Sequence, residues 1–282
     1  MIRWTCCLCT VGQVVHTLPQ GGPVWGVALL DDEVYVLRSD RNEVDMYDVI
    51  NYRIRLSDVG LSVPNILKVN DMISCAHYRC LYIVNIYVEC VYRLDVVRGS
   101  CRRWAVNDVP AGISVNAEHN VLVTCPRVRK IKELSSRGDL LRELTLPDDV
   151  INPWHAIQTR NGEFIVCHGG LHDAVHRVCK ISADGHNVIQ SHGGLSGSDV
   201  GQYDSPVHLA VDNNGFVFVA DFNNRRVTLL SPTLSYIRQV VSPDDLKWKP
   251  ERLRLDIHRR RLYVVDNRNY KHTAGRVVVF SV

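Results

Sequence analysis

A short apolar segment recurs six times along the chain, at intervals of 40 to 53 residues. Each copy is typical of a strand that ends on a polar or small residue, and the copies are Tyr35–Arg38, Tyr82–Asn85, Leu122–Cys125, Ile165–His168, Phe218–Asp221 and Tyr263–Asp266. A strand-rich repeat of this length is typical of a β-propeller, in which each repeat forms one four-stranded antiparallel blade. Six copies therefore predict an all-β fold with six blades.

Neighbouring strands follow the same repeat. Five first strands begin with a proline, which loses no ladder hydrogen bond at that position: Pro23, Pro110, Pro153, Pro206 and Pro250. The weakest copy begins at Asn70. Third strands are predicted to begin at Val44, Val91, Ile131, Val178, Val227 and Val277.

The sixth repeat ends after three strands, and its fourth strand is available at the other end of the chain. Residues Gln13–Leu18 share their pattern and closing proline with Leu140–Leu146, a predicted fourth strand. We expect Gln13–Leu18 to pair with Val277–Ser281 and to close the ring, leaving no open edge between the first and last blades. Residues 13–282 then form one domain, and residues 1–12 are expected to be a poorly ordered extension.

Composition sets broad limits on location and partner. The net charge is only +3, and the sequence has neither a signal-peptide pattern nor an apolar run long enough to span a membrane. We interpret the ten cysteines as mostly reduced thiols of an intracellular, cytoplasmic protein. Cys6 and Cys9 have the spacing of half a zinc knuckle, but no second pair follows, so this segment predicts no zinc site.

One repeat carries a family resemblance. Residues Gly193–Val227 combine a glycine-rich lead, Gly-Gln-Tyr, a proline, an apolar strand, Asp-Asn-Asn-Gly, Val-Ala-Asp and Asn-Arg-Arg-Val, and this run resembles an NHL repeat. The sixth repeat is a fair match and the first four are weak. The resemblance implies the six-bladed propeller of TRIM-NHL proteins, which binds protein partners or single-stranded RNA on one ring face without a small-molecule cofactor. It also implies substrate recognition for a ubiquitin ligase, although no RING pattern is present in this chain.

Basic residues are predicted to gather on one ring face, which we call the loop face. It is formed by the loops between second and third strands and by the loops that join consecutive blades. The basic candidates for contact with an anionic partner lie beside the third strands and are Arg127, Arg129, Lys130, His176, Arg177, Arg225 and Arg226. The alternative is structural, because Arg226 and Arg276 can each bond a nearby aspartate, Asp221 or Asp266. Lys130 and Arg177 are predicted to lack such a partner, since Cys125 and His168 occupy those positions.

A second set of candidates lies two residues after each first-strand proline, where the chain should line the mouth of the central channel. These candidates are Trp25, Gly112, His155, His208 and Arg252, with Met72 in the weakest copy and Trp154 beside His155. Aromatic side chains next to arginine can stack on bases or anchor a peptide. The alternative for either tryptophan is burial between blades.

An enzymatic function is the remaining alternative. Some propellers of related sequence are metal enzymes, including an amidating lyase with histidine-bound zinc, and such a resemblance implies a lyase or hydrolase. His155, His208 and His168 could converge near the axis and hold zinc, but chance alignment is easy among 12 histidines. The nucleophile-elbow and phosphate-loop patterns are absent from the sequence. We therefore predict a non-catalytic recognition module with no catalytic and no metal-binding residues.

Overall fold

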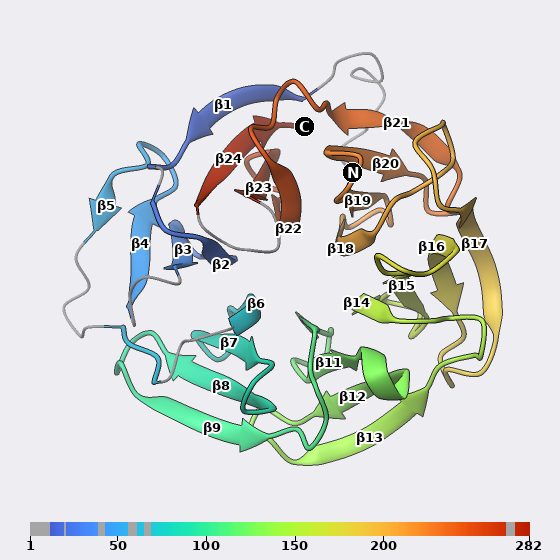
Figure 1. The fold of residues 1–282 in the computed structure, drawn as a ribbon. Helices are drawn as coiled ribbons and strands as arrows, with labels where there is room; N and C mark the ends of the chain where they lie inside the picture. The colour runs from blue at the N-terminus through green and yellow to red at the C-terminus, as the bar shows by residue number, and fades with distance from the viewer. Residues whose placement is uncertain (1–11, 20, 39–42, 56–60, 65–68, 269–273) are drawn as a thin grey trace.

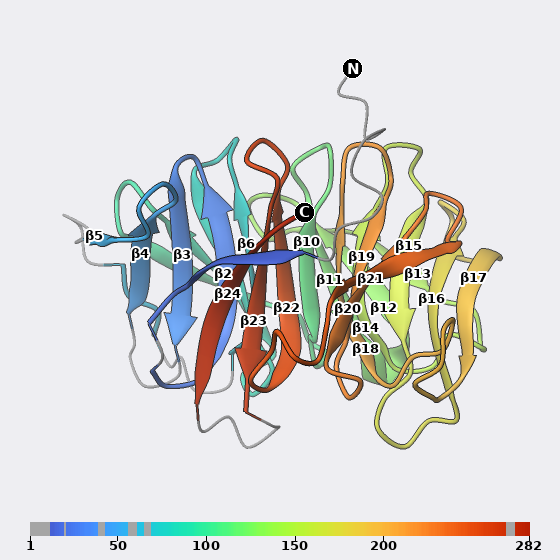
Figure 2. The same ribbon diagram turned by 90° about the horizontal axis from the view of Figure 1, so that it is seen from above.

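Six four-stranded antiparallel sheets form a ring, and their first strands lie nearest its central axis (Figure 1); we call the region around this axis the channel. The computed structural model describes residues 12–282, apart from residues 20, 39–42, 56–60, 65–68 and 269–273. Seen from the side, the strands run between two faces of the ring (Figure 2). The described part of the chain contains one short 3-10 helix, η1 (Pro126–Val128). No described helix is therefore long and apolar enough to cross a bilayer. The all-β, six-bladed prediction is confirmed; residues 1–11, including Cys6, Cys7 and Cys9, lie outside the described part.

Each of the first five blades is one continuous segment of chain. Blade one contains β2 (Val24–Leu30), β3 (Glu33–Arg38), β4 (Val44–Asp48) and β5 (Ile54–Arg55). Blade two contains β6 (Val69–Cys75), β7 (Cys80–Asn85), β8 (Cys90–Asp95) and β9 (Cys101–Ala105). Blade three contains β10 (Gly112–Val115), β11 (Val121–Cys125), β12 (Lys130–Leu134) and β13 (Leu140–Thr145).

Blades four to six complete the ring. Blade four contains β14 (Pro153–Gln158), β15 (Phe164–His168), β16 (Val175–Ile181) and β17 (Val188–Leu195). Blade five contains β18 (Pro206–Val211), β19 (Val217–Asp221), β20 (Arg226–Leu230) and β21 (Tyr236–Val241). Blade six contains β22 (Lys249–Asp256), β23 (Arg261–Asn267), β24 (Gly275–Ser281) and, from the other end of the chain, β1 (Gln13–Thr17).

The ring closes as the sequence predicts. Strand β1 pairs antiparallel with β24, from Gln13 opposite Ser281 to Thr17 opposite Val278. The next residue, Leu18, is fully buried and donates its backbone N–H to Val277 O at 2.9 Å. Its side chain belongs to the apolar cluster between blades six and one, so the closing segment contributes burial as well as ladder hydrogen bonds.

Five of the six first strands contain a bulge, and the bulge decides which residues reach the channel. The ladder register shifts between Val24 and Gly26, and shifts in the same way in β6, β14, β18 and β22. The residues left unpaired in these bulges are Trp25, Asn70, Trp154, Val207 and Glu251. The residues that follow them occupy equivalent positions beside the channel: Gly26, Asp71, His155, His208 and Arg252.

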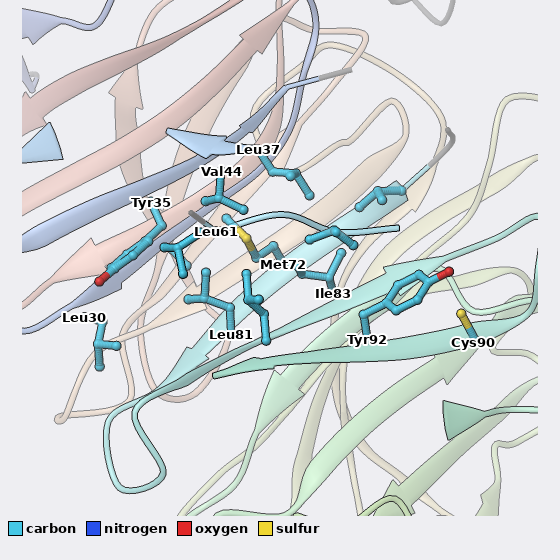
Figure 3. Packing of buried hydrophobic residues seen from close by; sticks show 14 residues of the cluster. Leu30, Tyr35, Leu37, Val44, Leu61, Met72, Leu81, Ile83, Cys90 and Tyr92 are labelled. Atoms are coloured by element: carbon cyan, nitrogen blue, oxygen red, sulfur yellow. The ribbon is translucent and has the colours of Figure 1, made fainter. Parts of the chain in front are cut away.

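This register corrects two sequence predictions. Trp25 is a bulge residue equivalent to Trp154, half-buried against the apolar cluster between blades one and two, and Gly26 takes the channel position instead. Glycine is required there, because a Cβ on Gly26 would lie 2.6 Å from Met72 Cβ. Met72 itself is fully buried in that cluster with Leu37, one residue beyond the channel position (Figure 3).

Deleting the closing segment should destabilise the propeller. We expect removal of residues 1–18 to lower the free energy of unfolding by at least about 2 kcal/mol, because it removes one strand of blade six and empties the site of the buried Leu18. Thermal melting followed by circular dichroism measures the change. A matched deletion of residues 1–11 retains every contact described above and should melt like the intact chain; equal melting of both deletions would contradict this account of closure.

Candidate functional site

One carboxylate in the channel connects four blades. Asp71 follows the bulge of β6 and is fully buried. Its Oδ1 accepts hydrogen bonds from the Met72 N–H at 2.8 Å and from Arg254 Nη2 of blade six at 2.9 Å. Its Oδ2 accepts the Ile113 N–H of blade three at 3.1 Å and lies 3.2 Å from His208 Nε2 of blade five. Both carboxylate oxygens are therefore used within the protein.

Two imidazoles stack beside this carboxylate. The rings of His155 and His208 lie 3.8 Å apart, and both side chains are buried. His208 Nδ1 faces the Leu253 N–H at 3.4 Å, so we assign the ring proton to Nε2, which donates to Asp71. His155 Nε2 lies 3.2 Å from Ile113 O, which assigns its proton to Nε2 as well.

Two arginines of β22 complete the group that we call the channel cluster: Asp71, His155, His208, Arg252 and Arg254. Arg254 also donates Nη2 to Met72 O, and Arg252 donates Nε to Asn70 O at 2.6 Å. Arg252 Nε lies 3.6 Å from Asp71 Oδ1. Because two guanidinium ions face one carboxylate, the cluster has an excess of one positive charge when both imidazoles are neutral.

The pKa values of the cluster follow from this arrangement. Burial alone would raise the pKa of Asp71, but Arg254, His208 and Arg252 outweigh it and hold that pKa well below its ordinary range. Burial lowers the pKa of His208 to about 4, despite the opposing effect of Asp71. Burial and the neighbouring His208 lower the pKa of His155 well below its ordinary value. At neutral pH the cluster therefore contains an ionised Asp71 and two neutral imidazoles.

Asp71, His155 and His208 are also the residues in the described part that come closest to a metal-ligand set, with candidate ligand atoms within 4.8 Å of one another. Their hydrogen bonds do not fit a metal ion. Both Nε2 atoms carry protons in the network, both Asp71 oxygens are occupied, and Arg254 Nη1 lies 3.0 Å from His208 Nε2. A cation at this position would have to displace a guanidinium ion and several hydrogen bonds.

His168 does not join this group, so the alternative in which three histidines converge near the axis does not hold. It is fully buried at the end of β15, and its Nε2 lies 3.4 Å from Cys179 Sγ of β16. Burial lowers the pKa of His168 to about 4. We therefore assign His168 to the packing within blade four.

A pocket of about 330 Å³ opens on the loop face above the channel cluster. Its apolar wall comes from loops and first strands of blades two, four and five: Ile86, Trp154, Gly170, Leu171, Val207 and Phe222. Its polar groups are Asn70, Ser205, Glu251 and Arg252. Five of the ten residues are bulge residues or follow a bulge in blades two, four, five and six, so the bulges connect this mouth pocket to the channel. Trp154 and Arg252 thus lie at the predicted channel mouth.

The predicted basic half-ring is largely paired with acidic groups. Lys130 Nζ lies 2.6 Å from Glu143, and Arg177 lies 3.6 Å from Asp149, so the prediction that these two residues lack an acidic partner is wrong. The partners come from β13 and from the loop between blades three and four. Arg127 is exposed, and no ion pair involves it among the residues that the structure describes.

The other basic candidates hold loops together. Arg129 pairs with Asp148 at 2.7 Å, and Arg226 pairs with Asp221 at 2.8 Å, which confirms the structural alternative for Arg226. The Arg276–Asp266 pair, at 2.7 Å, confirms it for blade six. Arg225 donates to three backbone carbonyls, those of Trp248, Pro243 and Leu246.

His176 is a positioning residue of the mouth pocket. It is buried, so the prediction that it presents charge on the surface is wrong. Its Nδ1 accepts the Ser205 N–H at 3.0 Å, and its Nε2 donates to Gly170 O at 2.9 Å. Both partners line the mouth pocket, so His176 joins two of its walls.

Comparison with known proteins supports the fold. No protein-family model and no curated protein matches the chain. Among solved structures, it is similar to the pyrroloquinoline-quinone-bound aldose sugar dehydrogenase of Streptomyces coelicolor, with a TM-score of 0.69, 13% identity and coverage of 96% of this chain and 97% of the other. It is also similar to virginiamycin B lyase from Staphylococcus aureus, with a TM-score of 0.62, 11% identity and coverage of 87% of this chain and 80% of the other. The Cps50 (Swd1) β-propeller domain of Myceliophteria thermophila is similar too, with a TM-score of 0.60, 11% identity and coverage of 92% of this chain and 83% of the other. At these identities, the similarities show the propeller fold alone.

Removing the central carboxylate should destabilise the ring strongly. We expect Asp71→Ala to lower the free energy of unfolding by about 3–5 kcal/mol, because it leaves Arg254 buried without its counter-ion. Urea unfolding measures this loss. Asp148→Ala is the matched control: its side chain is 96% exposed, and loss of its pair with Arg129 should cost less than about 1 kcal/mol. Similar losses in both variants would contradict the central role of Asp71.

Stability should also fall as the solution becomes mildly acidic. His208 has a folded-state pKa of about 4, below its ordinary value near 6.5, so the unfolded chain binds the proton first. The contribution of neutral His208 to the free energy of unfolding is fully present above about pH 6.5. It decreases by about 1.4 kcal/mol per pH unit as the pH falls towards 4. His155, whose pKa is also lowered, adds to the slope.

Urea unfolding at several values between pH 7.5 and 4.5 tests this pH dependence. His208→Gln should be less sensitive to pH than the wild type, and the exposed His258→Gln should retain the wild-type slope. An unchanged slope in His208→Gln would show that folding does not lower the pKa of His208.

Proposed function

We propose that this propeller is a non-catalytic recognition module that binds a protein partner on its loop face, around the mouth pocket. The observation that carries the proposal is the pocket itself, where Trp154, Leu171 and Val207 present apolar surface next to a few polar groups. Aromatic side chains in a concave, mostly apolar site are typical of the residues that contribute most to protein recognition. Leu171 is 57% exposed at the rim and is available to a partner.

The charge arrangement favours a protein over RNA. Phosphate binding depends on cations that can neutralise the backbone of the nucleic acid. Here Lys130, Arg129 and Arg177 already face acidic residues, and Arg225 and Arg226 hold loops. An RNA would have to compete with these contacts, whereas an apolar pocket needs no such exchange.

A finer form of the proposal is that the propeller recognises substrates for a ubiquitin ligase of the TRIM-NHL type. Its support is the resemblance of Gly193–Val227 to an NHL repeat. In the structure this segment includes strands β18 and β19, and Ser205, Val207 and Phe222 within it line the mouth pocket. The repeat that carries the resemblance thus also contributes to the proposed binding surface.

An enzymatic function remains the competing hypothesis, because Asp71, His155 and His208 are buried together in the channel. The hydrogen bonds of the channel cluster argue for a structural role instead. Stoichiometric zinc or another transition metal in the purified protein, lost in His155→Ala, would favour the enzymatic hypothesis and count against the proposal.

Selection from a random displayed-peptide library tests the proposed surface. We expect peptides that bind the wild type to lose at least about tenfold in affinity for Leu171→Glu, because a charge would stand at the rim of an apolar pocket. Ile50→Glu is the matched control, since Ile50 is 76% exposed in the β4–β5 turn on the opposite face. Peptides that bind both variants equally would place recognition elsewhere.

A random single-stranded RNA pool provides the second arm of the test. We expect weak binding that changes little in Lys130→Glu/Arg177→Glu. Strong, salt-sensitive RNA binding that this double variant abolishes would overturn the choice of a protein partner.

A further inference from the structure

Two residues that line the mouth pocket carry hydrogen-bond donors for which the described residues offer no acceptor. Trp154 Nε1 is buried and has no hydrogen-bond partner among the described residues. Arg252 donates through Nε and Nη2 to Asn70 O and through Nη1 to Glu251 O, which leaves a second hydrogen on each terminal nitrogen. Buried donors of this kind are costly unless an acceptor reaches them. The pocket is therefore suited to a group rich in acceptors.

The charges around the pocket favour an anion. Arg252 belongs both to the pocket wall and to the channel cluster, where two guanidinium ions face the single carboxylate of Asp71. The aromatic face of Phe222, which could attract a ligand cation, is already covered by Lys249 Nζ at 4.7 Å from the ring centroid. A second cation would meet repulsion from Lys249 and Arg252, whereas an anion would be attracted by both.

Glu251 is the acidic side chain in the wall of this pocket, and it limits the attraction. Its carboxylate accepts a hydrogen bond from Asn267 Nδ2 at 2.8 Å, and burial raises its pKa. An ionised Glu251 would oppose a second carboxylate. Changes at Glu251 and Arg252 should therefore have opposite effects on the binding of an anion.

We propose that the mouth pocket binds the C-terminal residue of a protein partner, with the terminal carboxylate on Arg252 and Trp154 Nε1 and an apolar side chain against Leu171 and Val207. A guanidinium ion can donate two parallel hydrogen bonds to a carboxylate. The volume of about 330 Å³ is at the small end of ligand sites, which suits one residue with its carboxylate. This inference rests on the proposed function and names the part of the partner that enters the pocket.

The loop face favours a chain terminus over a free small acid. Beyond Leu171, the loops of this face expose Tyr87 (55%) and Val200 (75%), which can contact the residues that precede a bound terminus. A free acid would use none of this surface. A peptide terminus should therefore bind more tightly than a small acid of the same chemistry.

Fluorescence polarisation with pooled, N-terminally labelled peptides tests the proposal on the full-length chain. Pools of random pentapeptides that end in leucine, isoleucine or phenylalanine are compared as free acids and as C-terminal amides. We expect the acids to bind at least about tenfold more tightly, because the amide loses the charge-assisted hydrogen bonds. N-acetyl-leucine should compete weakly; competition as strong as that of the peptides would identify a small-acid site and overturn the assignment to a protein terminus.

Four variants assign the contacts. Arg252→Gln and Trp154→Phe should lower the affinity for the peptide acids and leave the affinity for the amides unchanged. Leu171→Glu should lower the affinity for both forms, and Glu251→Gln should raise the affinity for the acids. Arg252→Gln is scored only if its circular dichroism spectrum matches the wild type, and Trp154→Phe provides the same test without a change in the channel cluster. Stronger binding in Arg252→Gln together with loss in Glu251→Gln would show a cationic ligand and overturn the proposal.

Failure of this inference is distinguishable from failure of the proposed function. If displayed peptides bind at Leu171 but acids and amides bind equally, the loop face recognises a partner without capturing its terminus, and this inference alone is wrong. If no peptide binds in a Leu171-dependent manner, both are wrong.

Discussion

The buried carboxylate of Asp71 is the interaction on which the centre of the ring depends. Adjacent blades are held together by apolar clusters, such as the one around Met72 in Figure 3, but these clusters join only neighbours. Asp71 instead bonds directly to blades three, five and six across the channel. Because an unpaired buried charge is so costly, each partner is constrained to remain in place once Asp71 is ionised.

The fold could be predicted from the sequence more fully than the site. The sixfold period, the prolines and the missing fourth strand of blade six were sufficient to predict the blades and the closing pair of β1 and β24. Positions in the channel were harder, because a bulge of one residue changes which side chain faces the axis. Four first strands have both a proline and a bulge, but the number of residues between the two differs. The channel position lies two residues after Pro153 and Pro206, so His155 and His208 were assigned correctly. It lies three residues after Pro23, so the assignment to Trp25 was one residue too early.

Asp71 was missed for the same reason, whereas Arg254 was missed because it lies two residues beyond the channel position of β22. Blade two has no proline before its first strand, so its alignment pointed to Met72 instead of the residue before it. The available signal was the charge itself, since an aspartate and an arginine in otherwise apolar first strands require partners if they are buried. Which partners they find depends on contacts between residues 183 positions apart, which a repeat pattern does not encode.

The antiparallel pairing of β1 with β24 has a mechanical consequence. Gln13 lies opposite Ser281, so the two chain ends leave the closing pair at the same end of its ladder. A pulling force applied between the termini would load these hydrogen bonds one after another, beginning at Gln13, instead of sharing the force across the ladder. The ring would then open like a zipper at its closing blade under a modest force, before the five continuous blades begin to separate.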